Sequence, residues 1–135
     1  MSSFNDAIIE EFRANGGKVG GQFESVSMLL LTTTGRNTGR QVVSPLVYTR
    51  SGDAYVVAAS NAGSDSHPQW YLNLLANPGV TVEVGDASFG ARAEIASAAE
   101  RDRLFAAHAE AMPAFAEYET ATNRVIPMVT LNLES

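Results

Sequence analysis

The stretch TTTGRNTGRQVVSPL, residues 32–46, carries two glycines and two arginines between two runs of apolar and β-branched residues. These flanking runs, 26–33 and 42–49, have the composition of β-strands. The glycines permit the left-handed or closely approaching backbone that a tight connection needs. The stretch therefore predicts a β-hairpin. Its loop is either a solvated turn with surface arginines or a nest of N–H groups that holds an anion.

Further short runs rich in apolar or β-branched residues predict four more strands, at 54–59, 80–84, 88–94 and 128–133. Gly85 and Asp86 between two of these runs predict a tight two-residue hairpin. Pro45 cannot donate a hydrogen bond to a sheet ladder. We therefore expect it at a sheet edge, at a bulge or at the start of a strand.

Helical periodicity and stop signals predict helices at about 4–15, at 67–76, at 98–112, and in a short piece after Pro113 through Tyr118. The second helix is expected to begin with Ser66 or His67 as its cap and Pro68 in its first turn. The third opens with Ser97 and Glu100 at the spacing of a capping box.

Hairpin-connected strands with helices between and after them predict an α+β, mainly β fold. We expect an antiparallel sheet closed or half-closed into a barrel, with helices on its open sides. A chain of 135 residues fits one domain, so the prediction is a single domain over residues 1–135. A Rossmann domain is disfavoured, because regular βαβ alternation and a G-x-G-x-x-G fingerprint after the first strand are missing.

Composition limits the classes of function. Nine basic residues against fifteen acidic ones argue against a general nucleic-acid binder. The chain has no cysteine, and His67 and His108 lack metal-binding spacing, so neither a metal site nor a thiolate nucleophile is expected. The N-terminal residues lack the basic region of a signal peptide, and no apolar run could span a bilayer. We expect a cytoplasmic protein without an integral membrane segment.

Charge makes the opening stretch distinctive. No acidic residue occurs between Glu24 and Asp53, whereas three arginines do: Arg36, Arg40 and Arg50. In an acidic chain this is a local positive field, which suits a phosphate or a carboxylate.

The segment ASNAGSDSHPQWYLNLLANP, residues 59–78, is a second candidate for binding. Small residues precede a helix start, where backbone N–H groups attract anions. Trp70 and Tyr71 could stack on a flat ligand, although the simpler interpretation of Trp70 is a core residue. No G-x-S-x-G motif accompanies the serines. A cradle without a catalytic constellation favours a protein that positions a redox cofactor.

Four blocks of the sequence resemble the deazaflavin-dependent nitroreductase family, small split β-barrel oxidoreductases of the FMN-binding split-barrel type that use coenzyme F420. The blocks are LLLTTTGRNTGRQVVSPL (29–46), YVVAASNAG (55–63), HPQWYLNLLANP (67–78) and NRVIPMV (123–129). They occur in the family's order and spacing, and the similarity covers roughly residues 15–133.

The resemblance implies a site for each part of the cofactor. Its phosphate and tail side would be held by Arg36, Asn37, Thr38, Val42, Val43, Ser44, Pro45, Leu46 and Val47. Its deazaflavin ring would lie along Ala58, Ala59, Ser60 and Asn61. The pocket would be completed by Gln69, Trp70, Tyr71, Leu72, Asn73 and Phe115. The site of the acceptor substrate would be lined by Met112, Phe115 and Tyr118.

The sequence also departs from the family's pattern. Close relatives often carry lysine, arginine and lysine where this chain has Asn37, Val42 and Asn61. Arg40 is then the neighbouring cation that could replace one of them. At Met112 and Phe115 the chain lacks the tyrosines that nitroimidazole-activating relatives carry. The reductase activity is therefore better supported than the nitroreductase name.

The leading hypothesis is an oxidoreductase that binds reduced F420 and passes hydride to a flat electrophilic acceptor: a quinone, an enone or a nitroaromatic. Ser60 would orient the ring or the acceptor by a hydrogen bond, and Tyr118 would donate a proton or stack. The alternatives are an FMN-dependent split-barrel oxidoreductase and a non-catalytic lipid- or cofactor-binding protein of the same fold. The sequence leaves both a monomer and a homodimer open.

Overall fold

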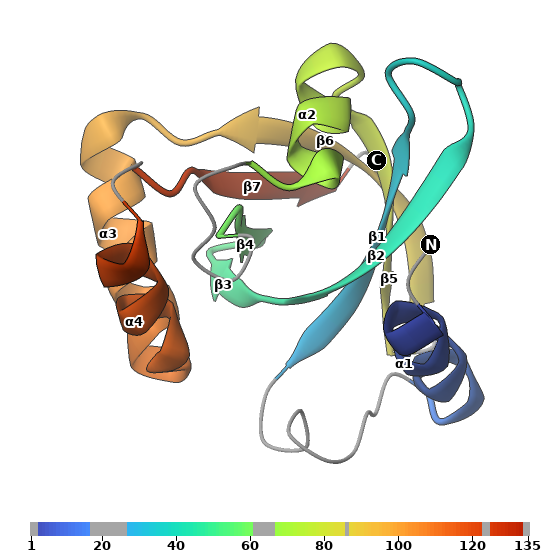
Figure 1. Cartoon of the computed structure of the whole chain (residues 1–135), viewed down its shortest axis with the longest axis horizontal. Helices are drawn as coiled ribbons and strands as arrows, with labels where there is room; N and C mark the ends of the chain where they lie inside the picture. The colour runs from blue at the N-terminus through green and yellow to red at the C-terminus, as the bar shows by residue number, and fades with distance from the viewer. Residues whose placement is uncertain (1–2, 17–26, 61–66, 86, 123–124, 134–135) are drawn as a thin grey trace.

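The computed structural model of the protein describes residues 3–16, 27–60, 67–85, 87–122 and 125–133 (Figure 1). The described residues form, in chain order, α1 (Ser3–Ala14), β1 (Met28–Thr34), β2 (Gln41–Val47), β3 (Thr49–Ser51), β4 (Ala54–Ala58), α2 (Gln69–Ala76), β5 (Gly79–Val84), β6 (Ala87–Ile95), α3 (Ala98–Ala111), α4 (Ala114–Ala121) and β7 (Met128–Leu133).

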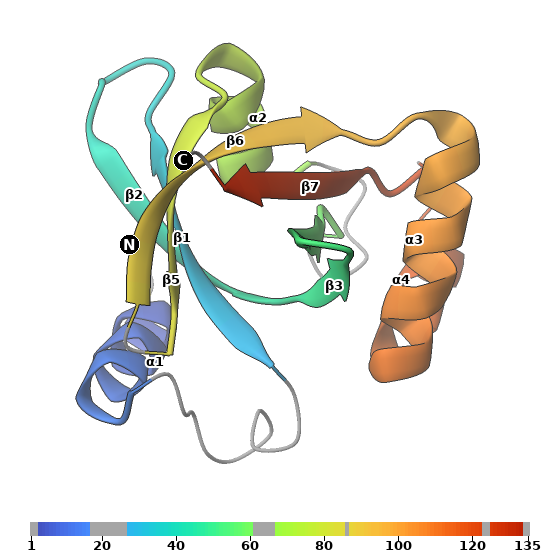
Figure 2. The ribbon, with the colours of Figure 1, turned by 180° about the vertical axis from the view of Figure 1, so that it is seen from behind.

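The strands form one curled antiparallel sheet with the order β2-β1-β5-β6-β7-β4-β3. Tyr48 alone separates β2 from β3, so the chain connects the two ends of the sheet directly. Seen from behind, the strands wrap around a common interior, with α3 and α4 on one side and α1 at the opposite end (Figure 2). This half-barrel confirms the predicted split-barrel fold, and β7 returns to pair with β4 and β6 as expected.

Two turn and edge predictions hold in detail. Pro45 lies on β2, an end strand whose only partner among the described strands is β1. An edge strand tolerates a residue that cannot donate to the ladder. Between β5 and β6, Val84 pairs with Ala87 and Gly85 has a φ of +58°, as a tight hairpin requires. Asp86, the other predicted turn residue, lies outside the described residues.

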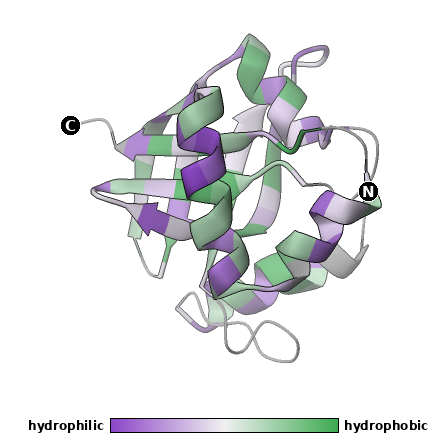
Figure 3. Ribbon diagram, turned by 90° about the vertical axis from the view of Figure 1, so that its left-hand side faces the viewer, coloured by the Kyte–Doolittle hydropathy of each residue, from purple (hydrophilic) through white to green (hydrophobic). Residues whose placement is uncertain are grey.

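The first strand is buried on both faces. Leu29 and Leu31 belong to the main core inside the curled sheet. Met28 and Leu30 point the other way and form a separate cluster with residues of α1. A third cluster lies where α3 and α4 cover β4 and β7. Figure 3, with the α3–α4 side toward the viewer, shows hydrophilic and hydrophobic residues alternating along these helices.

The helix ends both confirm and correct the sequence interpretation. At the start of α3, the Ser97 side chain accepts a hydrogen bond from the backbone N–H of Glu100, as predicted. The predicted start of α2 is wrong: the helix begins at Gln69, with Pro68 as an N-cap that supplies no side-chain acceptor. The proline disfavours helical backbone in His67 before it. Ser66, the other predicted cap, lies outside the described residues.

His108 fixes α3 to the sheet. Its side chain is fully buried, and Nδ1 lies 2.9 Å from the Thr49 hydroxyl oxygen of β3. The ring also packs against Phe115 of α4, with ring centroids 4.5 Å apart. Nε2 has no hydrogen-bond partner among the described residues. Burial lowers the pKa of His108 to about 4, so the folded protein holds this imidazole neutral.

The first prediction concerns this histidine. The unfolded chain takes up a proton near pH 6.5, whereas the folded one does so near pH 4. The contribution of the neutral imidazole to the free energy of unfolding is therefore fully present above pH 6.5. It decreases by about 3 kcal/mol at most as the pH falls toward 4. Urea unfolding at a series of pH values should show this loss in the wild type and not in His108→Gln. His67→Gln, the matched control, should retain it. An equal loss in His108→Gln would contradict the assignment.

Candidate functional site

The loop between β1 and β2 is a compact turn that depends on two glycines. The Gly35 N–H donates to the Arg40 carbonyl at 2.7 Å, and the Gly39 N–H donates to the Gly35 carbonyl at 2.9 Å. Gly39 has a φ of +72°, in the left-handed region. A Cβ atom on Gly35 would lie 2.7 Å from the Thr38 hydroxyl oxygen. One glycine thus provides the left-handed backbone and the other the close approach.

Asn73 of α2 holds this loop in place. Its Oδ1 atom accepts hydrogen bonds from the backbone N–H of Arg36 at 3.2 Å and from the Arg36 guanidinium at 2.9 Å. Its Nδ2 atom donates to the Thr33 hydroxyl of β1 at 3.3 Å. Asn73 is only 4% exposed and Thr33 is fully buried. A single buried amide therefore connects the loop, the helix and the strand.

Gln69, one turn earlier on α2, completes the support of Arg36. Its Oε1 atom accepts a hydrogen bond from the second guanidinium nitrogen at 2.9 Å. Gln69 and Asn73 are four residues apart and therefore lie on one face of α2. Together their two amide side chains orient the Arg36 guanidinium along the helix.

These groups line a hollow of about 330 Å³ formed by Gly35, Arg36, Asn37, Thr38, Val42, Gln69 and Asn73. All but Gly35 were predicted as cofactor-binding residues from the sequence. They come from a loop, an edge strand and a helix that are separated along the chain. The fold therefore brings together two of the blocks that the sequence suggested independently.

The electrostatics of the hollow favour an anion. The two bonds that the Arg36 guanidinium forms with described residues go to neutral amide oxygens. Within the part of the chain that the structure describes, no carboxylate forms an ion pair with Arg36. Among the described residues, its positive charge is oriented but not neutralised, and N–H donors remain beyond those used by Asn73 and Gln69. An oxyanion could take bidentate bonds from such a group.

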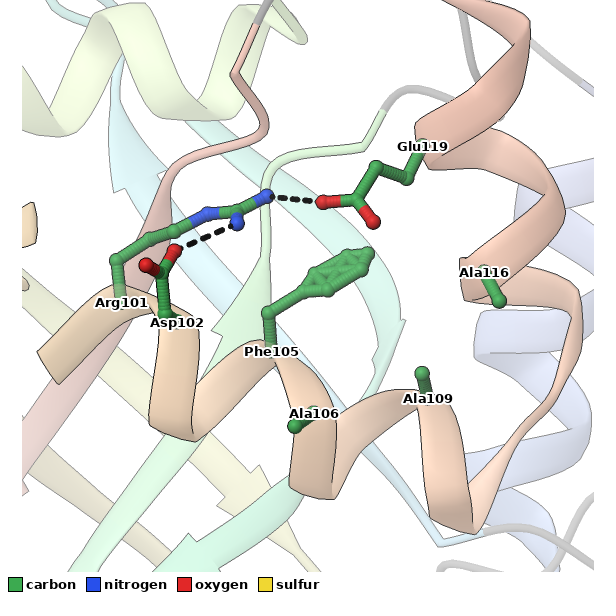
Figure 4. Close-up of a pocket in the computed structure, with 7 residues that line it drawn as sticks. All are labelled: Arg101, Asp102, Phe105, Ala106, Ala109, Ala116 and Glu119. Carbon is green, nitrogen blue, oxygen red and sulfur yellow. Dashed lines mark hydrogen bonds and ion pairs between the residues drawn. The ribbon is translucent and has the colours of Figure 1, made fainter. Parts of the chain in front are cut away.

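A second hollow, of about 290 Å³ between α3 and α4, shows the contrasting case (Figure 4). Arg101 at its rim pairs with Asp102 at 3.0 Å and with Glu119 at 3.1 Å. Its Nε atom also donates to the Ile126 carbonyl at 2.8 Å. Two carboxylates thus neutralise Arg101, which connects the two helices to the segment before β7. The rest of the lining includes three alanines and Phe105, so this hollow has no free charge for an anion.

Other predicted cofactor residues lie outside the first hollow. Val43 packs into the α1 cluster on the opposite face of β2 from Val42. Trp70 and Tyr71 are buried in the main core, in agreement with the simpler interpretation of the tryptophan. Arg40 is exposed, and its backbone N–H donates to the Thr38 hydroxyl. The remaining predicted residues of the strand and helix are half-buried: Ser44, Pro45, Leu46, Val47 and Leu72.

The predicted ring-side residues sit at the end of β4. Ala58 faces the cluster under α3 and α4, whereas Ala59 belongs to the main core. Ser60 follows them and is also buried. Asn61 lies outside the described residues. This strand end therefore separates the main core from the α3–α4 cluster.

The predicted acceptor residues gather near that strand end and not at the hollow. Met112, Phe115 and Tyr118 all pack into the cluster that contains Ala58. The Phe115 and Tyr118 rings meet edge to face, with centroids 5.5 Å apart. Phe115 is buried and Tyr118 is half-buried, so the tyrosine is the more accessible of the two.

Sequence reasoning missed Thr33 and His108. Thr33 continues the alternation that points Leu29 and Leu31 into the barrel, so its position predicts a buried hydroxyl that needs a partner. His108 lies on the apolar face of α3, and its contact with Thr49 spans 59 residues of sequence. No local sequence pattern predicts that contact. The described residues hold no cluster of metal-ligating side chains, and none of their helices has the length and apolar character needed to cross a bilayer.

Comparison with known proteins gives consistent matches. The profile of the F420H(2)-dependent quinone reductase family matches residues 7–132. An F420H(2)-dependent quinone reductase of Mycobacterium tuberculosis is 36% identical over 131 residues, which cover 94% of this chain and 86% of that protein.

Two solved structures are similar over most of their length. One is described as an F420-H2 dependent reductase, FDR-A. It has a TM-score of 0.72 and 36% identity and covers 78% of this chain and 93% of its own. The other, described as a domain-swapped dimer, has a TM-score of 0.74 and 33% identity and covers 94% of this chain and 92% of its own.

The second prediction tests the amide that supports the loop. Asn73→Ala would leave the buried Thr33 hydroxyl without its donor and the Arg36 N–H without its acceptor. We expect a loss of about 2 to 3 kcal/mol in the free energy of unfolding. The matched control is Asn77→Ala at the exposed end of the same helix, which should cost less than about 1 kcal/mol. Equal losses measured by urea unfolding would contradict the role of Asn73.

Proposed function

Since the chain belongs to the F420H(2)-dependent quinone reductase family, we propose that the hollow beside Arg36 binds the phosphate side of reduced coenzyme F420. The protein is an oxidoreductase of the split-barrel fold, F420 is its cofactor, and a quinone is the acceptor that fits the family. When bound, the cofactor supplies the hydride. The residues of the chain bind it, orient it and manage the accompanying proton.

The single observation that carries the phosphate assignment is the partnering of Arg36. A guanidinium held by two neutral amides keeps its full charge, and Asn73 and Gln69 restrict its orientation before any ligand arrives. Such preorganisation lowers the entropy that binding must overcome. The donor set therefore fits the anionic part of the cofactor, with Asn37 and Thr38 as polar neighbours in the same hollow.

The deazaflavin ring is assigned to the end of β4. Ala58 and Ala59 have small side chains that allow a planar group to lie close to the backbone, and Ser60 supplies a hydroxyl for orientation. The hydride acceptor is assigned to the neighbouring cluster of Met112, Phe115 and Tyr118, which Ala58 shares. The assignment rests on the family resemblance and on the packing of α4 beside β4.

Reduction of a quinone to a hydroquinone needs one hydride and one proton, and the proton must reach a quinone oxygen. Tyr118 carries the hydroxyl proposed for this transfer, since its half-buried position leaves it accessible from solvent. Its ring is held edge to face by Phe115, which is itself packed on His108. This stack restricts the orientation of the Tyr118 ring.

We propose a homodimer that functions in the cytoplasm. The relative described as a domain-swapped dimer supports the dimer over the monomer. A chain without cysteine suits a reducing compartment. The single-domain prediction for residues 1–135 is retained, because all the described strands belong to one sheet.

The third prediction tests the phosphate site through Arg36. Arg36→Gln removes the charge, so the dissociation constant for F420 should rise roughly ten- to a hundredfold at low ionic strength. The salt dependence of binding should become flatter. Arg36→Lys keeps the charge without the planar fork and should fall between the two. Fluorescence titration with F420 at low and moderate salt measures these differences.

The matched control is Arg92→Gln, which removes the same charge from the exposed face of β6. It should change the dissociation constant less than about twofold. Titration with FMN and with a fatty acid tests the alternative ligands, and both should bind more weakly than F420. Equal F420 affinities of wild type and Arg36→Gln at both salt concentrations would show that Arg36 is an ordinary loop residue.

The fourth prediction concerns the proton. Tyr118→Phe should lower kcat for quinone reduction by about a hundredfold, because it removes only the hydroxyl proposed as donor. The dissociation constant for F420 should change little. Tyr48→Phe, in the half-buried tyrosine between β2 and β3, serves as the control and should retain kcat. An unchanged kcat of Tyr118→Phe with both a quinone and a nitroaromatic would exclude the proton-donor role.

A further inference from the structure

His108 is a polar residue in an apolar environment. Its side chain is fully buried, and Nε2 has no hydrogen-bond partner among the described residues. An unpaired buried polar atom lowers stability, so an apolar side chain of similar size would suit the packing better. What the imidazole adds is the contact of Nδ1 with the Thr49 hydroxyl oxygen, at 2.9 Å. This link distinguishes His108 from a residue that only fills the core.

The link joins α3 to one end of the sheet. Among the hydrogen bonds between described residues, only that of Thr49 with His108 connects α3 with β3, the end strand. Arg101, in the first turn of α3, bonds instead to the Ile126 carbonyl and to Glu119 of α4. The helix is thus held near its start by Arg101 and near its end by His108.

From His108 the contacts continue to the proposed acceptor residues. The His108 carbonyl accepts a hydrogen bond from the Met112 N–H at 3.0 Å, and the Met112 carbonyl accepts one from the Phe115 N–H at 3.1 Å. The His108 and Phe115 rings meet with centroids 4.5 Å apart, and Phe115 meets Tyr118 at 5.5 Å. Backbone and side chain of His108 therefore both contact the segment that carries the acceptor residues.

The protonation state of His108 restricts what it can do. Burial lowers its pKa to about 4, so the ring is neutral at neutral pH and is a poor proton source for a quinone. Either the Thr49 hydroxyl or Nδ1 can donate in their contact. The ring also has no exposed surface with which to touch an acceptor. Its influence on the reaction must therefore pass through the residues packed on it.

We propose that His108 is a positioning residue of the acceptor site. Anchored to Thr49, the imidazole holds the Phe115 ring, and Phe115 in turn holds the ring of Tyr118. This inference rests on the function proposed above, in which Tyr118 donates the proton to the quinone. Proton transfer needs the hydroxyl within hydrogen-bond reach of the quinone oxygen, and a misplacement of about 1 Å can slow catalysis about a hundredfold.

Thr49→Val tests the link, because valine keeps the shape of threonine and lacks its hydroxyl. We expect kcat for quinone reduction to fall about tenfold, since the rings remain packed and the displacement is small. The dissociation constant for F420 should change less than about twofold, because Arg36 lies on a different element. Thr49→Ser keeps the hydroxyl and should restore kcat. Thr130→Val, the matched control, removes a half-buried hydroxyl from β7 and should retain kcat.

His108→Leu breaks the same link from the other side. It should lower kcat at least as much as Thr49→Val does, and adding Thr49→Val to it should have no further effect, because the two residues act through one contact. Additive losses would mean that the two side chains act separately, which overturns the inference. Rates are compared per folded protein, as circular dichroism measures it.

A spectroscopic readout is independent of turnover. When fluorotyrosine replaces the tyrosines, the Tyr118 signal in the fluorine NMR spectrum is identified by its loss in Tyr118→Phe. Thr49→Val should shift this signal, whereas Thr49→Ser and Thr130→Val should leave it in place. Tyr71, in the main core, serves as the internal reference.

The outcomes separate this inference from the proposed function. An unshifted Tyr118 signal in Thr49→Val overturns the positioning role whatever the activity. So does an unchanged kcat of Thr49→Val in an enzyme that Tyr118→Phe impairs. A kcat that Tyr118→Phe leaves unchanged overturns the proposed proton donor instead.

Discussion

The constraint on which the structure depends is the double burial of β1. Four consecutive apolar residues, Met28–Leu31, cannot be satisfied by a sheet with one wet face. The sheet curls around Leu29 and Leu31, and α1 covers Met28 and Leu30 on the opposite face. The same alternation continues to Thr33, whose inward hydroxyl meets Asn73. Asn73 in turn fixes Arg36, so the strand pattern that defines the core also positions the charge of the candidate site.

Much of this architecture could be predicted because short local sequence patterns determine it. Gly35 and Gly39 predicted the tight loop, and Ser97 with Glu100 predicted the start of α3. Pro45 predicted an edge position as one of its options. The start of α2 was misplaced because a helix-favouring position for Pro68 was assumed, whereas the chain is extended there.

Residues that line the hollow were named from the sequence as a candidate site, but the hydrogen bonds that join them were not. Arg36 and Asn73 were both chosen from the sequence, but their bond spans 37 residues, and no local rule couples them. The side of a strand on which a residue lies is equally hidden when neighbouring positions are both apolar, which is why Val42 and Val43 were grouped although they face different neighbours. Arg36 lies in an acid-free segment, whereas Arg101 lies between Glu100 and Asp102, but neither pattern identifies the tertiary partners. Only tertiary structure shows that carboxylates neutralise one and amides orient the other.

The place of β7 has a consequence for biosynthesis. This strand fills the gap between β4 and β6, and Val129 and Leu131 complete the main core. While the ribosome has not yet released residues 128–133, the emerging chain exposes two unpaired strand edges at once. Exposed edges of this kind attract other chains. The synthesis of β7 therefore closes the period in which nascent copies are most prone to associate wrongly, and chaperone protection is most valuable until this strand emerges.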